Sequence, residues 1–219
     1  MNLNSLATDR IRIYGDHSEK ICIILVGAHA DEIPQIISEG DKGFFSIAVT
    51  IDDWNAELSP WKAAPVFGDE PFGDGASGLL DAVETGLIPF ISEKYGPKKF
   101  ILMGYSLAGL FALYGIYKSR CFCGAIAVSP SVWFPGWKEF IEDRVPNADF
   151  VCLSLGDREE KTKNRTMACV GDNIRYMNKL LTEQGIETCL EWNPGGHFRD
   201  VPQRMKKGIV AGLKLLNSR

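Results

Sequence analysis

Short apolar runs alternate with longer amphipathic runs along this 219-residue chain, and this alternation narrows the choice of fold more than any other feature. The run Ile21–Val26 is apolar at nearly every position, which suits a strand covered on both faces, as in a parallel sheet. Six further runs read as strands: residues 11–14, 44–51, 99–103, 125–129, 150–155 and 188–192.

Four longer runs between these strands predict helices. Residues 78–94 place their apolar side chains on one stripe. We expect Pro89 to kink this helix, because proline lacks the N–H donor and clashes with the preceding turn. Leu107–Lys118 is apolar almost all round, which is typical of a buried helix, whereas residues 166–184 and 199–216 are amphipathic.

Strands that alternate with helices indicate a mainly parallel sheet between two helical layers. We therefore expect an α/β fold, a three-layer α/β/α sandwich, in a single domain of residues 1–219. Residues 52–77 have no clear period and contain several aromatic residues, prolines and glycines. Two interpretations of this insertion are open: a lid or binding wall, or a surface loop packed on its own aromatic side chains.

Charge and hydropathy exclude several classes of partner. The net charge is −4 and no basic stripe is visible, so we expect no nucleic acid. The longest apolar stretch, residues 21–28, is far too short to span a bilayer, so we expect no membrane partner. No charged-then-apolar signal segment opens the chain, which makes a cytoplasmic location the expectation. The six cysteines, three of them in predicted strands, are expected to be buried free thiols.

The sequence gives no sign of a cofactor or a metal. Residues 73–78 match G-x-G-x-x-G, but prolines disrupt any preceding strand and Lys98 stands near the place of the required acid. A P-loop motif and the ligand spacing of a zinc site are both absent from the sequence. We expect no cofactor and no metal.

The strongest candidate for chemistry is Ser106, where a predicted strand passes directly into a predicted helix. Gly104, Ser106 and Ala108 form a G-x-S-x-small pattern, in which a strained turn projects the serine hydroxyl above the sheet. Ala108 replaces the second glycine of the pattern, and a methyl group is the smallest addition there. We expect Ser106 to be a nucleophile; the alternative is a serine that only caps the helix Leu107–Lys118.

A nucleophilic serine needs a base, and the chain has three histidines. His197 alone follows the last predicted strand, the position that the order Ser, acid, His requires after an elbow of this kind. The acid should follow the strand at residues 150–155, where Asp157, Glu159 and Glu160 are candidates. Its role would be to orient the imidazole and stabilise the imidazolium.

Two backbone donors should form an oxyanion hole. Leu107, after the nucleophile, should supply one, and Ala28, after the strand Ile21–Val26, the other, with His29 as the alternative. Three aromatic residues are candidate walls of a substrate pocket: Trp54, Tyr105 and Trp133. Trp133 could equally belong to the core, because large aromatic side chains are usually highly buried.

Three stretches together resemble one branch of the α/β-hydrolases: residues 100–110, Ser129-Pro-Ser-Val-Trp-Phe134 and Gly195-Gly-His197. That branch includes esterase-D-like, feruloyl, acetyl and enterochelin-type esterases. The resemblance covers most of the chain from Ile21 onward and implies the α/β-hydrolase fold and ester hydrolysis without a cofactor. Related hydrolases often carry Gly-x-x-Asp/Glu in the acid loop, which favours Glu159 over Asp157, with Glu160 third.

We therefore expect a serine hydrolase that cleaves small carboxylic esters through a Ser-His-acid triad and an acyl-enzyme. An acyltransferase or peptidase on the same triad is the first alternative, since fold and triad do not fix the acyl acceptor. A non-catalytic binding protein of the same fold is the second, and it would require a broken triad. The natural ester and self-association into a homo-oligomer stay open.

Overall fold

The computed structural model describes residues 8–16, 19–28, 33–37, 43–96 and 98–218, and within them seven strands form one sheet. Their order is β1-β3-β2-β4-β5-β6-β7, with β1 antiparallel to β3 and all other neighbours parallel. The strands are β1 (Ile11–Gly15), β2 (Ile21–Val26), β3 (Phe45–Val49), β4 (Lys99–Tyr105), β5 (Phe122–Val128), β6 (Phe150–Gly156) and β7 (Glu187–Asn193). All seven predicted strands are confirmed, with small differences at their ends.

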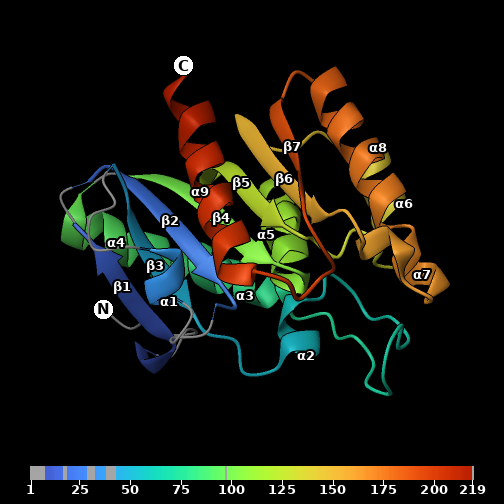
Figure 1. Ribbon diagram of the computed structural model, residues 1–219. Coiled ribbons are helices and arrows are strands. Elements are labelled where there is room, and N and C mark those ends of the chain that lie inside the picture. Colours follow the sequence, from blue (N-terminus) through green and yellow to red (C-terminus); the bar gives the residue numbers. More distant parts are fainter. Residues whose placement is uncertain (1–7, 17–18, 29–32, 38–42, 97, 219) are drawn as a thin grey trace.

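Helices cover both faces of the sheet and make the expected three layers (Figure 1). One face carries α9 (Val201–Asn217) and α1 (Ile33–Ile36). The other face carries a larger group: α3 (Ala76–Ala82), α4 (Ile88–Tyr95), α5 (Leu107–Lys118), α6 (Trp137–Glu142) and α8 (Val170–Glu183). The remaining helical segments are α2 (Trp54–Leu58), α7 (Arg165–Ala168), the 3-10 turns Thr8–Arg10 and Glu159–Lys161, and the π-helical turn Val83–Leu87.

The two cores explain why β2 is apolar throughout. Ile24 belongs to the core under α5, whereas Ile23 and Leu25 belong to the core under α9. Because successive side chains of a strand point to opposite faces, a strand between two helical layers needs apolar residues at every position. Helix α5 is buried over almost its whole length, as its uniformly apolar sequence predicts.

Pro89 marks the main irregularity in the predicted helix at residues 78–94. A π-helical turn, Val83–Leu87, separates α3 from α4, and the Ile88 N–H donates to the Val83 carbonyl five residues back. The wider turn accommodates a residue that has no N–H and whose ring crowds the preceding turn. The kink that we expected at Pro89 therefore takes the form of a π-helical turn just before the proline.

Three short helices, α1, α2 and α6, were not expected from the sequence. Each spans only four to six residues, too short for a helical period to stand out. Helix α2 lies within the aromatic insertion at residues 52–77 and begins at a local cap, where Asp53 Oδ1 accepts from the Ala56 N–H at 2.9 Å. The segment therefore starts as ordered structure, although its sequence reads as a loop.

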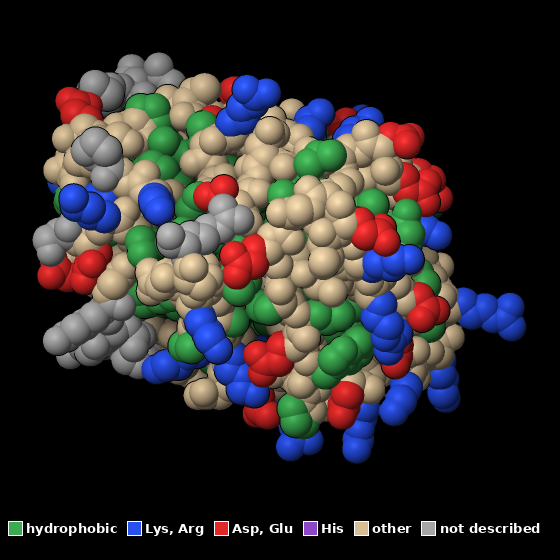
Figure 2. All heavy atoms as spheres, turned by 90° about the horizontal axis from the view of Figure 1, so that it is seen from above, with side chains coloured by type: hydrophobic (Ala, Val, Ile, Leu, Met, Phe, Trp, Pro, Cys, Tyr) green, Lys and Arg blue, Asp and Glu red, His purple; other side chains and the backbone are tan. Residues whose placement is uncertain are grey.

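The surface of the protein carries charged side chains of both signs. Figure 2 shows Lys and Arg side chains interspersed with Asp and Glu on the face seen from above. Each helix of the described residues is too short or too polar to cross a membrane.

All six cysteines are free, but only Cys22 and Cys152 are buried. The expectation of burial is wrong for Cys121, which is exposed because it lies in the bend just before β5, and Cys123, Cys169 and Cys189 are only half-buried.

Candidate active site

Ser106 lies on a sharp turn between β4 and α5, in a backbone conformation with φ 58° and ψ −122°. Non-glycine residues rarely adopt a positive φ, and strain of this kind is concentrated at functional positions. The turn depends on Gly104, since a Cβ there would lie 2.2 Å from the Ala108 carbonyl oxygen. Ala108 itself is fully buried without displacing the turn, so the sequence tolerates alanine at the second small position.

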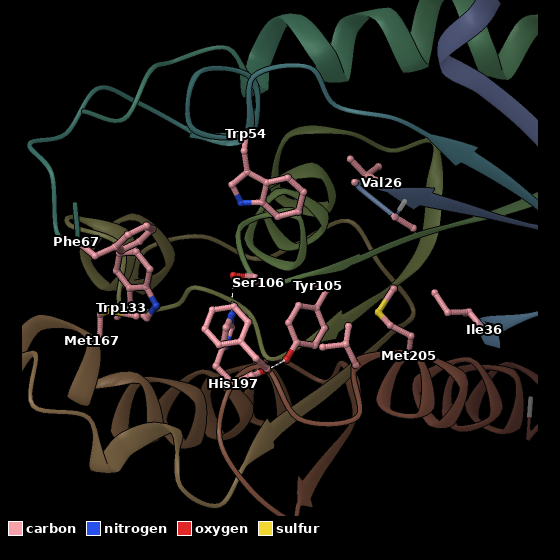
Figure 3. A pocket seen from close by; sticks show the side chains of 14 residues that line it. Val26, Ile36, Trp54, Phe67, Tyr105, Ser106, Trp133, Met167, His197 and Met205 are labelled. Carbon is pink, nitrogen blue, oxygen red and sulfur yellow. Dashed lines mark hydrogen bonds between the residues drawn. The ribbon is translucent and has the colours of Figure 1, made fainter. Parts of the chain in front are cut away.

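A chain of two hydrogen bonds joins Ser106, His197 and Glu159. Ser106 Oγ lies 3.0 Å from His197 Nε2, and His197 Nδ1 lies 2.7 Å from Glu159 Oε2. A carboxylate can only accept, so Nδ1 carries the hydrogen and Nε2 is free to accept from the serine hydroxyl. The side chains of the serine and the histidine point toward one another (Figure 3).

The other two candidate acids have different partners. Asp157 Oδ1 accepts from the Gly195 N–H at 2.8 Å, and Glu160 forms an ion pair of 2.9 Å with Arg175. Glu159 is therefore the carboxylate that the structure brings to His197, whereas Asp157 supports the loop that carries the histidine.

Glu159 is buried among donors, its side chain only 5% exposed. Its Oε1 accepts from Ser129 Oγ at 2.7 Å, from the Gly156 N–H at 2.7 Å and from Arg204 Nη1 at 3.0 Å. Burial by itself would raise the pKa of this carboxyl. The hydrogen bond and charge of His197, together with the donors Ser129 and Gly156, outweigh burial and hold the pKa below its ordinary value.

Arg204 is a residue that the sequence reasoning missed. Its side chain is 2% exposed, and its Nη2 donates to the carbonyls of Pro194 and Gly196, at 3.1 and 2.9 Å. One guanidinium thus holds both the acid and the loop around His197. The signal was an arginine on the apolar stripe of the last helix, next to Met205, where a cation is rarely buried unless it is paired.

The two residues expected to supply the oxyanion donors lie next to Ser106 in the chain and on the lining of its cavity. Leu107 is the first residue of α5, so its N–H belongs to the orphan donors of a helix N-terminus. Ala28 lines the same cavity as Ser106, while its alternative, His29, lies outside the described residues. The sequence reasoning did not assign Ser131, whose Oγ lies 3.4 Å from Ser106 Oγ and whose N–H donates to the Ser106 carbonyl at 3.0 Å.

A cavity of about 550 Å³ opens above Ser106 and His197 (Figure 3). The three expected wall residues, Trp54, Tyr105 and Trp133, all line it. Trp133 is also 7% exposed and packed into the core, so both interpretations of this residue hold. Seven apolar lining residues were not expected: Val26, Ile36, Phe67, Met167, Phe198, Val201 and Met205. Only Phe198, Val201 and Met205 lie near one another in the sequence, and the other four come from separate segments, so no single local pattern connects the set.

Tyr105 fixes the histidine loop from the cavity side. Its hydroxyl donates to the His197 carbonyl, and its ring lies 5.2 Å from the imidazole (Figure 3). Burial raises the pKa of Tyr105 above its ordinary value, which keeps the hydroxyl protonated and able to donate.

The insertion at residues 52–77 contributes to two different environments. Trp54 and Phe67 line the cavity, whereas Trp61 and Phe72 pack against Phe134, with ring centroids 5.9 and 5.0 Å away. Movement of this segment as a lid stays a prediction. Within the described part of the chain, no three His, Cys, Asp or Glu side chains are grouped so as to hold a metal ion.

No family model and no curated protein matches the sequence. Among solved structures, the siderophore hydrolase EstA from Aspergillus nidulans has a TM-score of 0.71 and 18% identity, over 94% of this chain and 89% of that chain. An IroE-like serine hydrolase from Shewanella oneidensis has a TM-score of 0.71 and 17% identity, over 93% and 74%. The enterobactin esterase FES from Shigella flexneri has a TM-score of 0.64 and 14% identity, over 94% and 55%. At such identities the likeness extends to the fold, and the chain has the α/β-hydrolase fold.

Proposed function

We propose that this protein is a serine hydrolase that cleaves carboxylic esters. The observation that carries the proposal is the hydrogen-bonded chain from Ser106 through His197 to Glu159, at 3.0 and 2.7 Å, at the floor of an apolar cavity. These three side chains lie within hydrogen-bond reach in the order that a nucleophile, its base and an orienting acid need, which supports the proposal.

The reaction would begin with attack of Ser106 Oγ on the ester carbonyl while His197 Nε2 takes the hydroxyl proton. The N–H groups of Leu107 and Ala28 would stabilise the negative oxygen of the tetrahedral intermediate. His197 would then return the proton to the departing alkoxide, leaving an acyl group on Ser106. Attack by water, with His197 again as base, would release the acid and restore the serine.

Glu159 would remain ionised throughout. Its depressed pKa fits this role, because an anion beside Nδ1 stabilises the imidazolium that forms in each half-reaction. Its buried position also removes competition from water for the Nδ1 hydrogen bond.

Labelling with a fluorophosphonate probe tests the proposal. We expect the wild-type protein to be labelled and to hydrolyse p-nitrophenyl acetate, and Ser106→Ala to lose both activities. His197→Ala should lose turnover while its circular dichroism spectrum stays native. A folded wild-type protein that neither reacts with the probe nor hydrolyses the ester would refute the proposal and favour a non-catalytic binding protein.

The ester-hydrolysis assay, extended to alcohol acceptors and to amide substrates, separates an esterase from an acyltransferase and a peptidase. Added alcohol acceptors should not divert most of the acyl group from water, and a peptide amide panel should be turned over far more slowly than the esters. The structural neighbours include siderophore hydrolases, so enterobactin belongs in the ester panel. The shared fold alone does not carry their substrate over to this chain.

A further inference from the structure

The cavity extends to two sides of Ser106, and its two arms have different linings (Figure 3). On one side, Phe67, Trp133 and Met167 lie together. Phe198 belongs with them, since it shares a second cavity of about 250 Å³ with Trp133 and Met167. We call these four residues the aromatic arm.

The opposite side is aliphatic. Val26, Ile36 and Met205 lie there in Figure 3, and Val201 precedes Met205 by one helical turn on α9, so it faces the same way. We call these four residues the aliphatic arm. Trp54 lies over Ser106 between the two arms, its ring against Gly27, where a Cβ would come within 2.6 Å of it.

The cavity of about 550 Å³ has fourteen described lining residues, and none is Asp, Glu, Lys or Arg. The second cavity, beside the aromatic arm, is also lined by Arg158 and by Glu159, whose charge is paired with Arg204. The Tyr105 hydroxyl is already engaged by the His197 carbonyl. An ionised group that enters the aliphatic arm loses its hydration and gains no counter-charge from the described lining, which is strongly unfavourable.

Two aromatic side chains at the aromatic arm are exposed to solvent. Phe198 is 89% exposed and Phe67 is 48% exposed. The Phe198 ring meets the imidazole of His197 edge-on at 5.0 Å, and the Phe67 ring meets Trp133 edge-on at 5.9 Å. Exposed apolar groups gathered at a cavity mark a binding surface, and a further ring can add edge-to-face or offset contacts to them.

We propose that the site takes uncharged esters that join an aromatic group to an aliphatic chain, with the ring in the aromatic arm and the chain in the aliphatic arm. The inference rests on the proposed function, in which water cleaves the ester C–O bond to give an acid and an alcohol. A cavity of about 550 Å³ falls within the range of about 300–1,000 Å³ that buries most of a drug-sized ligand.

A matched pair of phenyl esters tests the absence of charge. Phenyl hexanoate and the monophenyl ester of adipic acid have chains of similar reach, but the second ends in a carboxylate. We expect kcat/KM for phenyl hexanoate to be higher by at least about 30-fold, since the carboxylate would be buried without a partner. Equal rates, or faster turnover of enterobactin than of phenyl hexanoate, would overturn the inference.

Two variants test the arms. Phe198→Ala removes an exposed ring and should lower the preference for phenyl hexanoate over ethyl hexanoate by about 5- to 10-fold. Val201→Trp fills the aliphatic arm and should lower the preference for phenyl hexanoate over phenyl acetate by at least about 10-fold. Val210→Ala is the matched control, because Val210 is exposed on the same helix outside the cavity lining and should change neither ratio.

Failure of the two-arm inference can be distinguished from failure of the proposed function. If fluorophosphonate labels Ser106 and p-nitrophenyl acetate is hydrolysed, but neither variant changes its ratio, the two-arm inference fails and the hydrolase remains. If Ser106 is not labelled in the folded protein, the proposed function itself fails.

Discussion

Arg204 Nη1 lies 3.0 Å from Glu159 Oε1, and the two charged side chains form a buried pair behind the histidine. The same guanidinium donates to the carbonyls of Pro194 and Gly196, in the loop that carries His197. Glu159 binds His197 through its other oxygen, Oε2. Arg204 therefore positions the acid and the histidine relative to each other without touching the cavity.

Replacing Arg204 by methionine should lower kcat for p-nitrophenyl acetate by about 10- to 100-fold and leave KM within about twofold. The loss arises because the carboxylate and the loop are no longer held in one geometry, and KM is spared because Arg204 does not line the cavity. Breaking a buried pair also destabilises a protein by about 3–5 kcal/mol, which urea unfolding would measure. Steady-state kinetics on the folded fraction separates the two effects.

Arg204→Lys is the control for charge, since it keeps the cation but not the fork of donors that reaches several acceptors at once. We expect it to recover only part of kcat. In a Glu159→Gln background, Arg204→Met should add little further loss of kcat, because both act through the histidine. Full additivity of the two losses would mean that Arg204 acts independently of the acid.

Glu159→Gln should lower kcat by about 10³- to 10⁴-fold, the scale of loss when the orienting carboxylate of a triad is replaced by its amide. Asp157→Asn should lower it by less than about tenfold, because Asp157 bonds the Gly195 N–H and not the imidazole. Glu160→Gln should have the smallest effect, as its partner is Arg175 at the surface. Steady-state kinetics on the three variants compares them directly, and equal losses would contradict this assignment.

Stability should depend on pH through Glu159 with a defined sign. Its pKa in the folded protein is lowered, chiefly because His197 and the nearby donors outweigh burial. The stabilisation is therefore complete above the ordinary glutamate pKa of about 4.3 and is lost as the pH falls below it toward the folded pKa. Urea unfolding should show the difference in stability between wild type and Glu159→Gln shrinking from pH 6 to pH 3. A difference that widens on acidification would contradict the lowered pKa.

The sequence predicted the sheet well because each strand carries its own signal. Ile21–Val26 and Phe150–Gly156 are apolar runs between turn residues, and a strand buried on both faces allows little else. Helix α2 is different, since five residues held by the Asp53 cap depend more on local hydrogen bonds than on a period. The π turn before Pro89 depends likewise on how the chain resolves one steric clash.

The site was predictable where chain order constrains it. Ser106 follows its strand directly, and His197 follows the last strand, so both positions could be found by counting elements. Glu159 and Asp157 are two residues apart, and only the path of the loop decides which one reaches the imidazole. Arg204 acts through contacts to three separate segments, at Ser129, at Glu159 and at the loop of residues 194–196, and a one-dimensional pattern does not contain such contacts.

The elbow should tolerate change at Ala108 but not at Gly104. A Cβ at position 104 would lie 2.2 Å from the Ala108 carbonyl oxygen, which is backbone and cannot rotate away. Gly104→Ala should therefore destabilise the protein by at least about 1–3 kcal/mol and abolish labelling of Ser106. Ala108→Gly, the control, should lose at most about 1 kcal/mol and keep activity within about twofold. Thermal unfolding and probe labelling give both readouts; a Gly104→Ala protein with wild-type labelling would contradict the role of the glycine.

Tyr105→Phe should separate the contribution of the Tyr105 hydroxyl to kcat from the contribution of its ring to KM. The ring stays in the cavity wall, so KM should change by less than about twofold, but the hydrogen bond to the His197 carbonyl is lost. A net hydrogen bond of about 0.5–1.5 kcal/mol corresponds to a fall in kcat of about 2- to 13-fold. Because burial raises the pKa of Tyr105 above its ordinary value of about 10, the hydroxyl stays protonated at lower pH, and the ratio of wild-type to variant kcat should be constant from pH 7 to 9. A ratio that falls toward one below pH 9 would show that the hydroxyl ionises in that range and that burial does not protect it.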